Sequence, residues 1–184
     1  MWIKPILKTS RPFWWPPASL QYEFDHLRKI KKEGRAYIFS VGSAINALIE
    51  QDILPDAACT YDPTVNNQYV FKNLKERNIG TVPLIYGTSV GYETLIDYPG
   101  PMLHMITSQD TVSPYYLQNE SHTYERVQDA PSIAVVTLQL LYKLGCNPVI
   151  LVGQDLAYPD QQRYAQGIEY HFASSKLSQK EVEK

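Results

Sequence analysis

Short apolar segments alternate with longer amphipathic segments along most of this chain, and this alternation limits the possible fold more than any other feature. The apolar segments are residues 36–41, 57–61, 82–86, 102–106 and 148–152. Between some of them, as in 66–77 and 132–144, apolar residues recur at helical spacing. Strands that alternate with helices predict βαβ crossovers. We therefore expect an α/β domain with a mainly parallel sheet and helices on both faces.

The best-defined elements are predicted near the end of the chain. Residues 132–144 have one apolar stripe, with Ser132 at the start and Gly145 suited to the helix stop. The segment Pro148–Val152 is strongly apolar, as is typical of a strand buried on both faces. Residues 107–128 have no clear period, so we expect either a functional lid or an element that the pattern does not reveal.

Length and charge limit the function classes. A chain of 184 residues is enough for one domain, 1–184, in which 1–18 are atypical and 174–184 form a polar tail. The net charge of -2 argues against nucleic-acid or membrane binding as a general property. Neither a signal peptide nor a membrane span is recognisable, which predicts the cytoplasm. The two cysteines and four histidines have no metal-site spacing, so no metal site is predicted.

Ligands of parallel α/β sheets bind beyond the carboxyl ends of the strands, so the residues after each apolar segment are the candidates. Gly42 and Ser43 are predicted to form the turn that opens a helix. The free amides at such a helix start suit a phosphate; alternatively, the glycine is there only because the turn needs its backbone conformation. For Asp62 there are also two interpretations: it binds a ribose hydroxyl, a metal or a reacting proton, or it caps the turn before Pro63.

Three further candidates carry neutral polar groups. Ser89, Ser108 and Gln109 follow apolar segments and suit hydrogen bonding to a sugar or base edge, although each is also an ordinary turn former. Gln154 and Asp155 come directly after the last apolar segment, where unpaired polar groups are costly. For these two we favour a functional role over a capping role.

Several of these motifs occur together in one known family. The segments 37–44, 55–56, 61–63 and 153–158, which read YIFSVGSA, PD, YDP and GQDLAY, resemble the motility-associated factor (Maf) glycosyltransferase domain. That domain is similar to the archaeal 6-hydroxymethylpterin diphosphokinase MptE. The resemblance covers about residues 20–167 and implies a Rossmann-like fold with a sialyltransferase-like nucleotide site.

The resemblance implies three alternative functions. The leading one is transfer of a nonulosonic, sialic-acid-like sugar from a CMP donor to Ser or Thr of flagellin, without a cofactor. The second is transfer of pyrophosphate from ATP to a pterin alcohol, with Mg²⁺ as cofactor. The third is a non-catalytic remnant that binds a nucleotide or a partner. We expect Asp62 and Asp155 in the reacting region, and the nucleotide or sugar on Gly42, Ser43, Ser89, Ser108, Gln109 and Gln154.

One segment departs from the family pattern. The family opens with a strand followed by a Gly-Pro-Ser-Leu turn that approaches the nucleotide, whereas this chain has RPFWWPPASL at residues 11–20. Ser19 and Leu20 match, but Pro16 and Pro17 can offer neither an amide donor nor a turn with positive φ. We therefore hypothesise that this loop is degenerate through a local reading-frame change, and that activity is reduced or lost.

Overall fold

A four-stranded parallel sheet forms the centre of the computed structural model, which describes residues 20–117 and 124–153. The strands are β1 (Phe39–Val41), β2 (Ala57–Thr60), β3 (Leu84–Gly87) and β4 (Met102–Met105). They lie in the order β1-β2-β3-β4, and every neighbouring pair is parallel. The predicted α/β fold with a parallel sheet is confirmed.

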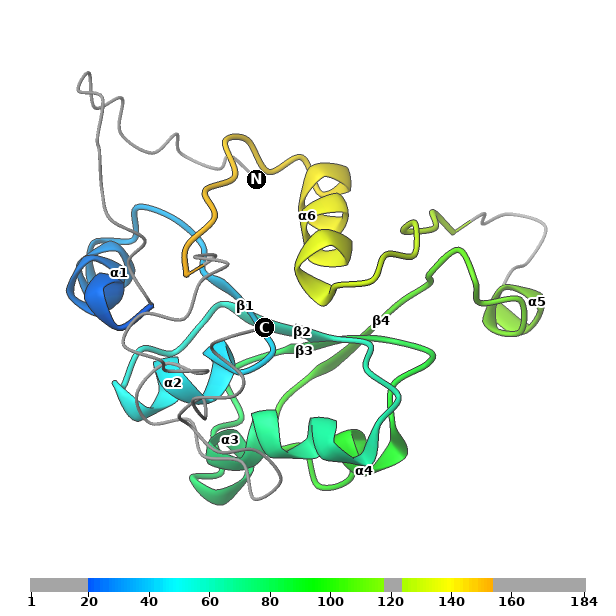
Figure 1. Cartoon of the computed structure of the whole chain (residues 1–184), viewed down its shortest axis with the longest axis horizontal. Coiled ribbons are helices and arrows are strands. Elements are labelled where there is room, and N and C mark those ends of the chain that lie inside the picture. Colours follow the sequence, from blue (N-terminus) through cyan, green and yellow to red (C-terminus); the bar gives the residue numbers. More distant parts are fainter. Residues whose placement is uncertain (1–19, 118–123, 154–184) are drawn as a thin grey trace, which may run out of the picture.

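Helices cover both faces of this sheet, which makes the fold Rossmann-like with three layers (Figure 1). One face carries α2 (Ala44–Glu50), the 3-10 helix η2 (Val65–Phe71), α3 (Lys72–Glu76) and α4 (Tyr92–Leu95). The opposite face carries α6 (Ile133–Lys143). The 3-10 helix η1 (Leu20–Glu23) leads into α1 (Phe24–Glu33), which packs beside α2, and α5 (Ser113–Leu117) follows β4.

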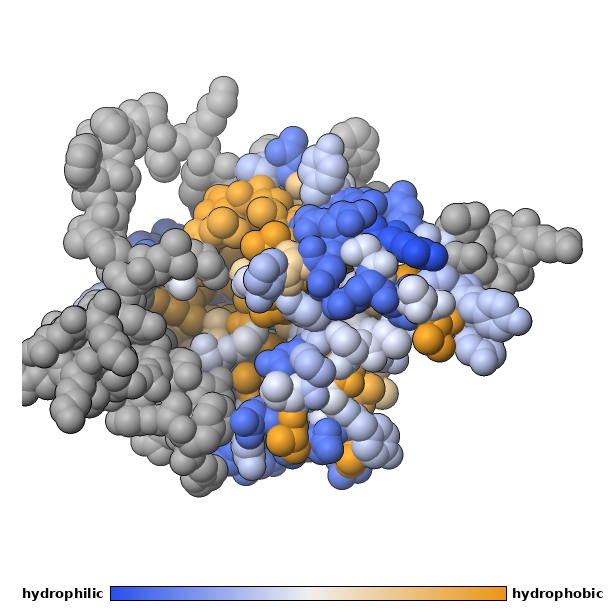
Figure 2. Space-filling model, turned by 45° about the vertical axis from the view of Figure 1, so that its right-hand side comes forward, coloured by the Kyte–Doolittle hydropathy of each residue, from blue (hydrophilic) through white to orange (hydrophobic). Residues whose placement is uncertain are grey.

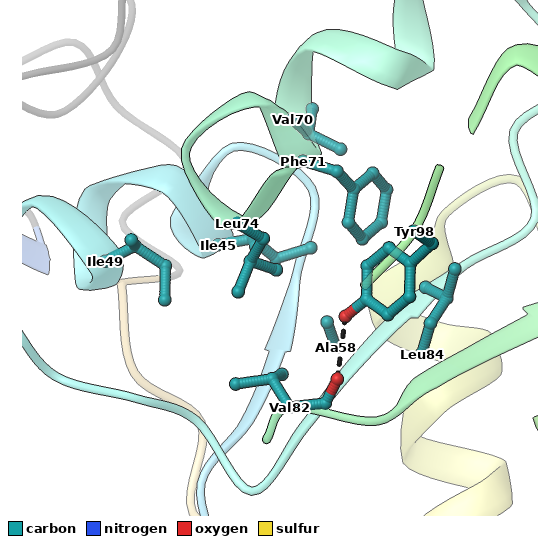
Figure 3. Packing of buried hydrophobic residues seen from close by; sticks show 9 residues of the cluster. All are labelled: Ile45, Ile49, Ala58, Val70, Phe71, Leu74, Val82, Leu84 and Tyr98. Carbon is teal, nitrogen blue, oxygen red and sulfur yellow. Dashed lines mark hydrogen bonds between the residues drawn. The ribbon is translucent and has the colours of Figure 1, made fainter. Parts of the chain in front are cut away.

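The packing follows from the alternation of side chains along each strand. Ala58 and Leu84 face α2 and α3, where they meet Phe71, Leu74 and neighbouring apolar side chains (Figure 3). Tyr98 closes this cluster, and its buried hydroxyl donates a hydrogen bond to the Val82 carbonyl over 2.9 Å. The strand neighbours of these two residues, Cys59 on β2 and Ile85 on β3, face the opposite side of the sheet.

The second face packs against α6. Cys59 and Ile85 meet Val136 there, and Ile133 and Leu140 lie at the margin of the cluster. The predicted helix over 132–144 is confirmed as Ile133–Lys143, and the Ser132 side chain caps it by accepting the Ala134 amide at 3.2 Å. Gly145 has a φ of 78°, the left-handed conformation expected after a helix end.

Two segments differ from the sequence-based expectation. The helix expected over 66–77 is split into the 3-10 helix η2 and the short α3. Val70, Phe71 and Leu74 are nevertheless buried, as their helical spacing predicts. The region 107–128 contains α5 and an isolated parallel bridge between Thr107 and Val127. Thr107 lies two residues after the end of β4, and its pairing with Val127 cannot be predicted from the spacing of apolar residues in either segment.

The strand expected at Pro148–Val152 is wrong for this structure. Within the described residues, this segment forms no backbone hydrogen bond with β1 or with any other strand. Ile150 is 57% exposed and Leu151 62% exposed, although both were expected in the core. The pairing needs a neighbouring strand in the sheet, and the sheet of the described residues ends at β1.

As to membranes, none of the described helices has the length and apolarity needed to span a bilayer.

Candidate functional site at the carboxyl edge of the sheet

The four strands end side by side, and this brings most of the candidate residues to one edge. Val41 is level with Cys59, Thr60 with Tyr86, and Gly87 with Met105. The loops that carry Ser43, Asp62, Ser89 and Ser108 therefore all leave the sheet at its carboxyl edge, as the parallel topology requires. We call this set of loops the carboxyl edge.

After β1, the chain turns sharply into α2. Gly42 has a φ of 53°, which favours glycine, and the space beside its α-carbon is open. Ser43 is the residue before α2, but its hydroxyl makes no capping hydrogen bond. The hydroxyl of Ser43 is thus not committed to the helix start.

Asp62 is exposed after β2, and its carboxylate has a partly structural role. One oxygen, Oδ1, accepts the Thr64 amide over 2.8 Å, which is the turn-capping geometry expected before Pro63. The second oxygen accepts no hydrogen bond from the described residues. The capping role and the functional role of Asp62 are therefore compatible, because each uses a different oxygen.

The serines after β3 and β4 hold neighbouring loops in place. Ser89 donates to the Tyr61 carbonyl over 2.7 Å and so ties its loop to the Asp62 loop. Ser108 Oγ accepts the Asp129 amide over 2.9 Å. Gln109 is exposed beside it. Both serine hydroxyls thus have a structural partner, and Gln109 has the freer polar group.

A cluster that the sequence analysis did not single out lies at the ends of β3 and β4. Thr88 Oγ1 donates to Asp110 Oδ2, and it lies 2.6 Å from His104 Nε2 and 3.1 Å from Ser113 Oγ. Because the single Thr88 proton goes to the carboxylate, His104 Nε2 carries a proton and donates to Thr88. His104 is exposed, and the centre of its ring lies 5.3 Å from that of Tyr86, with the two ring planes tilted by 40°.

Asp110 is the most strongly perturbed acid of this edge. It is only 8% exposed, and Oδ1 accepts the amides of Val112 and Ser113 over 3.0 and 2.9 Å. Burial by itself would raise the pKa of Asp110, but the hydrogen bonds from Thr88 and Ser113 outweigh it and lower the pKa to about 2. Both oxygens are therefore engaged in holding the loop, and the sequence signal for this was the polar stretch 107–110.

Gln154 and Asp155 lie outside the described residues, so their positions stay a prediction. The preceding Gly153 lines one groove together with Ser43, and this places the start of the GQD motif near the turn after β1. No cluster of three potential metal ligands occurs in the described part of the chain. The arrangement of the carboxyl edge offers neutral hydroxyl and amide groups and one partly free carboxylate.

Comparison with known protein families gives a match over most of the chain. A family model described as 6-hydroxymethylpterin diphosphokinase MptE-like matches residues 18–161, which is most of the chain. No curated protein and no solved structure matches the chain.

Proposed function

Because the chain belongs to the 6-hydroxymethylpterin diphosphokinase MptE-like family, we propose that it is a nucleotide-dependent transferase domain of the cytoplasm. Its reaction is transfer of a nonulosonic sugar from a CMP donor to a Ser or Thr hydroxyl, with flagellin as the acceptor. The observation that supports this most directly is that Ser43, Asp62 and Gln109 all follow strands that end at the carboxyl edge. A ribose or sugar is bound by neutral groups such as the Ser43 hydroxyl and the Gln109 amide, and by a carboxylate such as that of Asp62.

In this proposal the carboxylate of Asp62 is the general base. Its free oxygen takes the proton of the acceptor hydroxyl, the hydroxyl oxygen forms a bond to the anomeric carbon, and CMP leaves with the electrons of the broken bond. Asp155 is the second candidate for this role. Gly42 and Ser43 hold the phosphate, and Ser89, Ser108, Gln109 and Gln154 orient the sugar and the base.

The family description favours a second candidate, pyrophosphate transfer from ATP to a pterin alcohol. In that reaction Mg²⁺ would neutralise charge on the phosphate oxygens, and carboxylates would be its ligands. Asp62 and Asp155 are the residues that would hold the ion. Asp62 has an oxygen without a hydrogen bond from the described residues, which fits such a ligand.

The proline-rich first loop supports a third candidate, a remnant that binds a nucleotide without turning it over. Pro16 and Pro17 stand where the family places a glycine turn, and neither offers an amide to a phosphate. Binding would then be weaker than in a family member with the glycine turn.

Ligand-induced shifts of the melting temperature distinguish the first two candidates, and an assay of transfer distinguishes an active enzyme from a remnant that only binds. CMP or a CMP-sugar raises Tm without metal if the transferase proposal holds, whereas ATP raises it only with Mg²⁺ if the pyrophosphokinase proposal holds. Asp62→Asn is expected to bind CMP normally and to abolish transfer, because it removes the base and keeps the turn-capping oxygen. Asp25→Asn, an exposed change on α1, is the matched control. Equal transfer by Asp62→Asn and Asp25→Asn would refute the role of Asp62.

A further inference from the structure

An apolar groove lies beside β4, at the end of the described sheet opposite to β1. Its floor is the face of the sheet, through Ile85 and Leu103, and one wall is the end of α6, through Leu140 and Leu144. Another wall comes from the segment 124–127. The groove encloses about 560 Å³, and we call it the β4 groove. Figure 2, which brings the α5 side of Figure 1 forward, shows apolar areas bordered by hydrophilic surface.

The outer edge of β4 has backbone groups that no described strand uses. β4 is the last strand of the described sheet on this side. The Leu84 amide donates to the Pro101 carbonyl over 2.8 Å, and Leu84 lies level with Met102. Because alternate residues of a parallel strand bond to the same neighbour, the odd-numbered residues of β4 face β3. The amides and carbonyls of Met102 and His104 therefore point outward.

Further along the chain, this same edge is already paired. The Val127 amide donates to the Ile106 carbonyl over 2.8 Å, and the Ser108 amide donates to the Val127 carbonyl over 2.8 Å. This is the way in which a residue of a parallel strand pairs with its neighbour. Ile106 and Ser108 are even-numbered like the two outward residues of β4, so all these groups lie along one edge. The edge is thus competent for pairing, and its part at Met102–His104 has no strand partner among the described residues.

The chemistry of the edge restricts what can pair there. Residues 102–106 contain no proline and none of Lys, Arg, Asp and Glu, which are the residues that commonly protect an exposed edge. Met102 is 48% exposed and Leu103 is 52% exposed. Glu125 and Lys143, which line the groove, form an ion pair with each other over 3.0 Å. The groove therefore suits an uncharged segment with apolar side chains at alternate positions.

We propose that the outer edge of β4 and the β4 groove bind the acceptor polypeptide as an added strand, so that a Ser or Thr further along it reaches the transfer site. This inference rests on the transfer to a protein acceptor proposed above. The acceptor backbone pairs with the outward groups of Met102 and His104, and its alternate apolar side chains enter the groove. A polypeptide fits this edge better than a small molecule, because an extended chain offers donors and acceptors at the spacing of a strand.

The spacing of the sheet determines which residue of the acceptor is modified. All four strands end at the carboxyl edge, so the acceptor reaches the site of Asp62 along this edge. Asp62 follows β2, and a strand added outside β4 would lie three strand positions from β2, which is about 14 Å. An extended chain covers this distance in about four or five residues. We therefore expect the modified hydroxyl about four or five residues from the paired apolar segment.

A second copy of this chain fits the edge less well than a free acceptor segment. In a two-fold pair the two β4 strands would run antiparallel, and residues 99–101 of the copy would lie beside Thr107. Val127 already occupies that position. Pairing between copies would therefore be restricted to β4 itself, whereas a free segment can begin or end anywhere along the edge.

Peptides that lack selected backbone amides test this inference. The probe is a fluorescein-labelled peptide with alternating valine and threonine, followed by four glycines and one serine, and its binding is measured by fluorescence anisotropy. One version is N-methylated on the valines and another on the threonines. N-methylation removes donors from one edge of an extended peptide only. We therefore expect one version to lose affinity by at least about tenfold and the other to bind like the unmodified peptide.

Two substitutions on β4 separate the groove from the opposite face. Leu103→Glu places a charge in the groove and should raise the Kd of the peptide by at least about tenfold. Met102→Glu is the matched control, because Met102 is similarly exposed but its side chain lies on the other face of the strand. The control should bind the peptide normally. Leu144→Glu, just after α6, adds the same charge from another element, so the test does not depend on the folding of one variant.

The outcomes separate this inference from the proposed function. Normal binding of CMP without binding of the peptide, or equal affinity of the two N-methylated versions, overturns the inference alone. Equal peptide binding by Leu103→Glu and Met102→Glu does the same. No shift of Tm with CMP or a CMP-sugar refutes the transferase proposal, and with it the acceptor role of this edge, even if the peptide binds.

Amide hydrogen exchange identifies a competing occupant. The amides of Met102 and His104 should exchange rapidly in the free chain and slowly with the peptide bound. Slow exchange without the peptide would overturn the inference. If that protection depended on protein concentration, a second copy would be the occupant, and if it did not, another segment of the same chain would be.

Discussion

The buried carboxylate of Asp110 yields a prediction whose magnitude follows from the structure. Its pKa in the folded chain is about 2, against an ordinary value of 3.8, because hydrogen bonds from Thr88 and Ser113 favour the charged form more than burial disfavours it. A folded pKa below the unfolded one stabilises the protein above the unfolded value. That stabilisation is lost as the pH falls from about 4 toward 2.

The size of the effect follows from linkage. A lowering of nearly two pKa units corresponds to about 2.4 kcal/mol at neutral pH, and solvent near the carboxyl edge reduces this to about 1–2 kcal/mol. Asp110→Asn keeps an oxygen for the amides of Val112 and Ser113 but removes the charge. It should therefore lower the free energy of unfolding by about 1–2 kcal/mol at pH 7, and by about half as much at pH 3.

Urea denaturation at the two pH values measures this difference. Asp97→Asn is the matched control, because Asp97 is exposed and has a φ of 54°, which asparagine tolerates equally well. The control should change stability little at either pH. A loss for Asp110→Asn that is the same at pH 7 and pH 3 would refute the reasoning, since it would arise from packing and not from charge.

Three further predictions concern the core. Phe71→Ala should lower the free energy of unfolding by about 3–5 kcal/mol in urea denaturation, because the ring is fully buried in the cluster of Figure 3. Gly100→Ala should cost at least about 2 kcal/mol in the same assay, because its new β-carbon would lie 2.5 Å from the Val82 carbonyl oxygen. Burial raises the pKa of Cys59 to about 12 against a smaller opposing effect of Thr137, so Ellman's reagent at pH 8 should react with Cys146 only until urea is added. Rapid reaction of both thiols in the native protein would contradict this.

The sequence was sufficient for the order and type of the main elements. The strands at 57–60 and 102–105 and the helix at 133–143 lie within their predicted segments, because the apolar patterns that mark such elements are local in the sequence. Element ends were less predictable: β1 starts at Phe39, whereas the apolar segment starts at Ala36. A strand ends where pairing ends, and pairing depends on residues distant in sequence.

The candidate site was predicted in outline but not in its contacts. The rule that ligands bind at the carboxyl ends of parallel strands located the turns with Gly42, Asp62 and Ser89. That rule could not show that Ser89 is bonded to the Tyr61 carbonyl or that Thr88, His104 and Asp110 form one cluster. Those bonds join residues from different loops, and no local spacing predicts them.

The segment 148–152 shows what the sequence determines by itself and what only the tertiary structure determines. Sequence alone determined that it is apolar enough for a central strand, because composition and β-propensity are local properties. Only the tertiary structure showed that the described sheet stops at β1 and leaves a groove beside this segment. A strand becomes part of a sheet through hydrogen bonds to its neighbours. The neighbour that a strand pairs with comes from elsewhere in the chain, and the residues of 148–152 do not specify it.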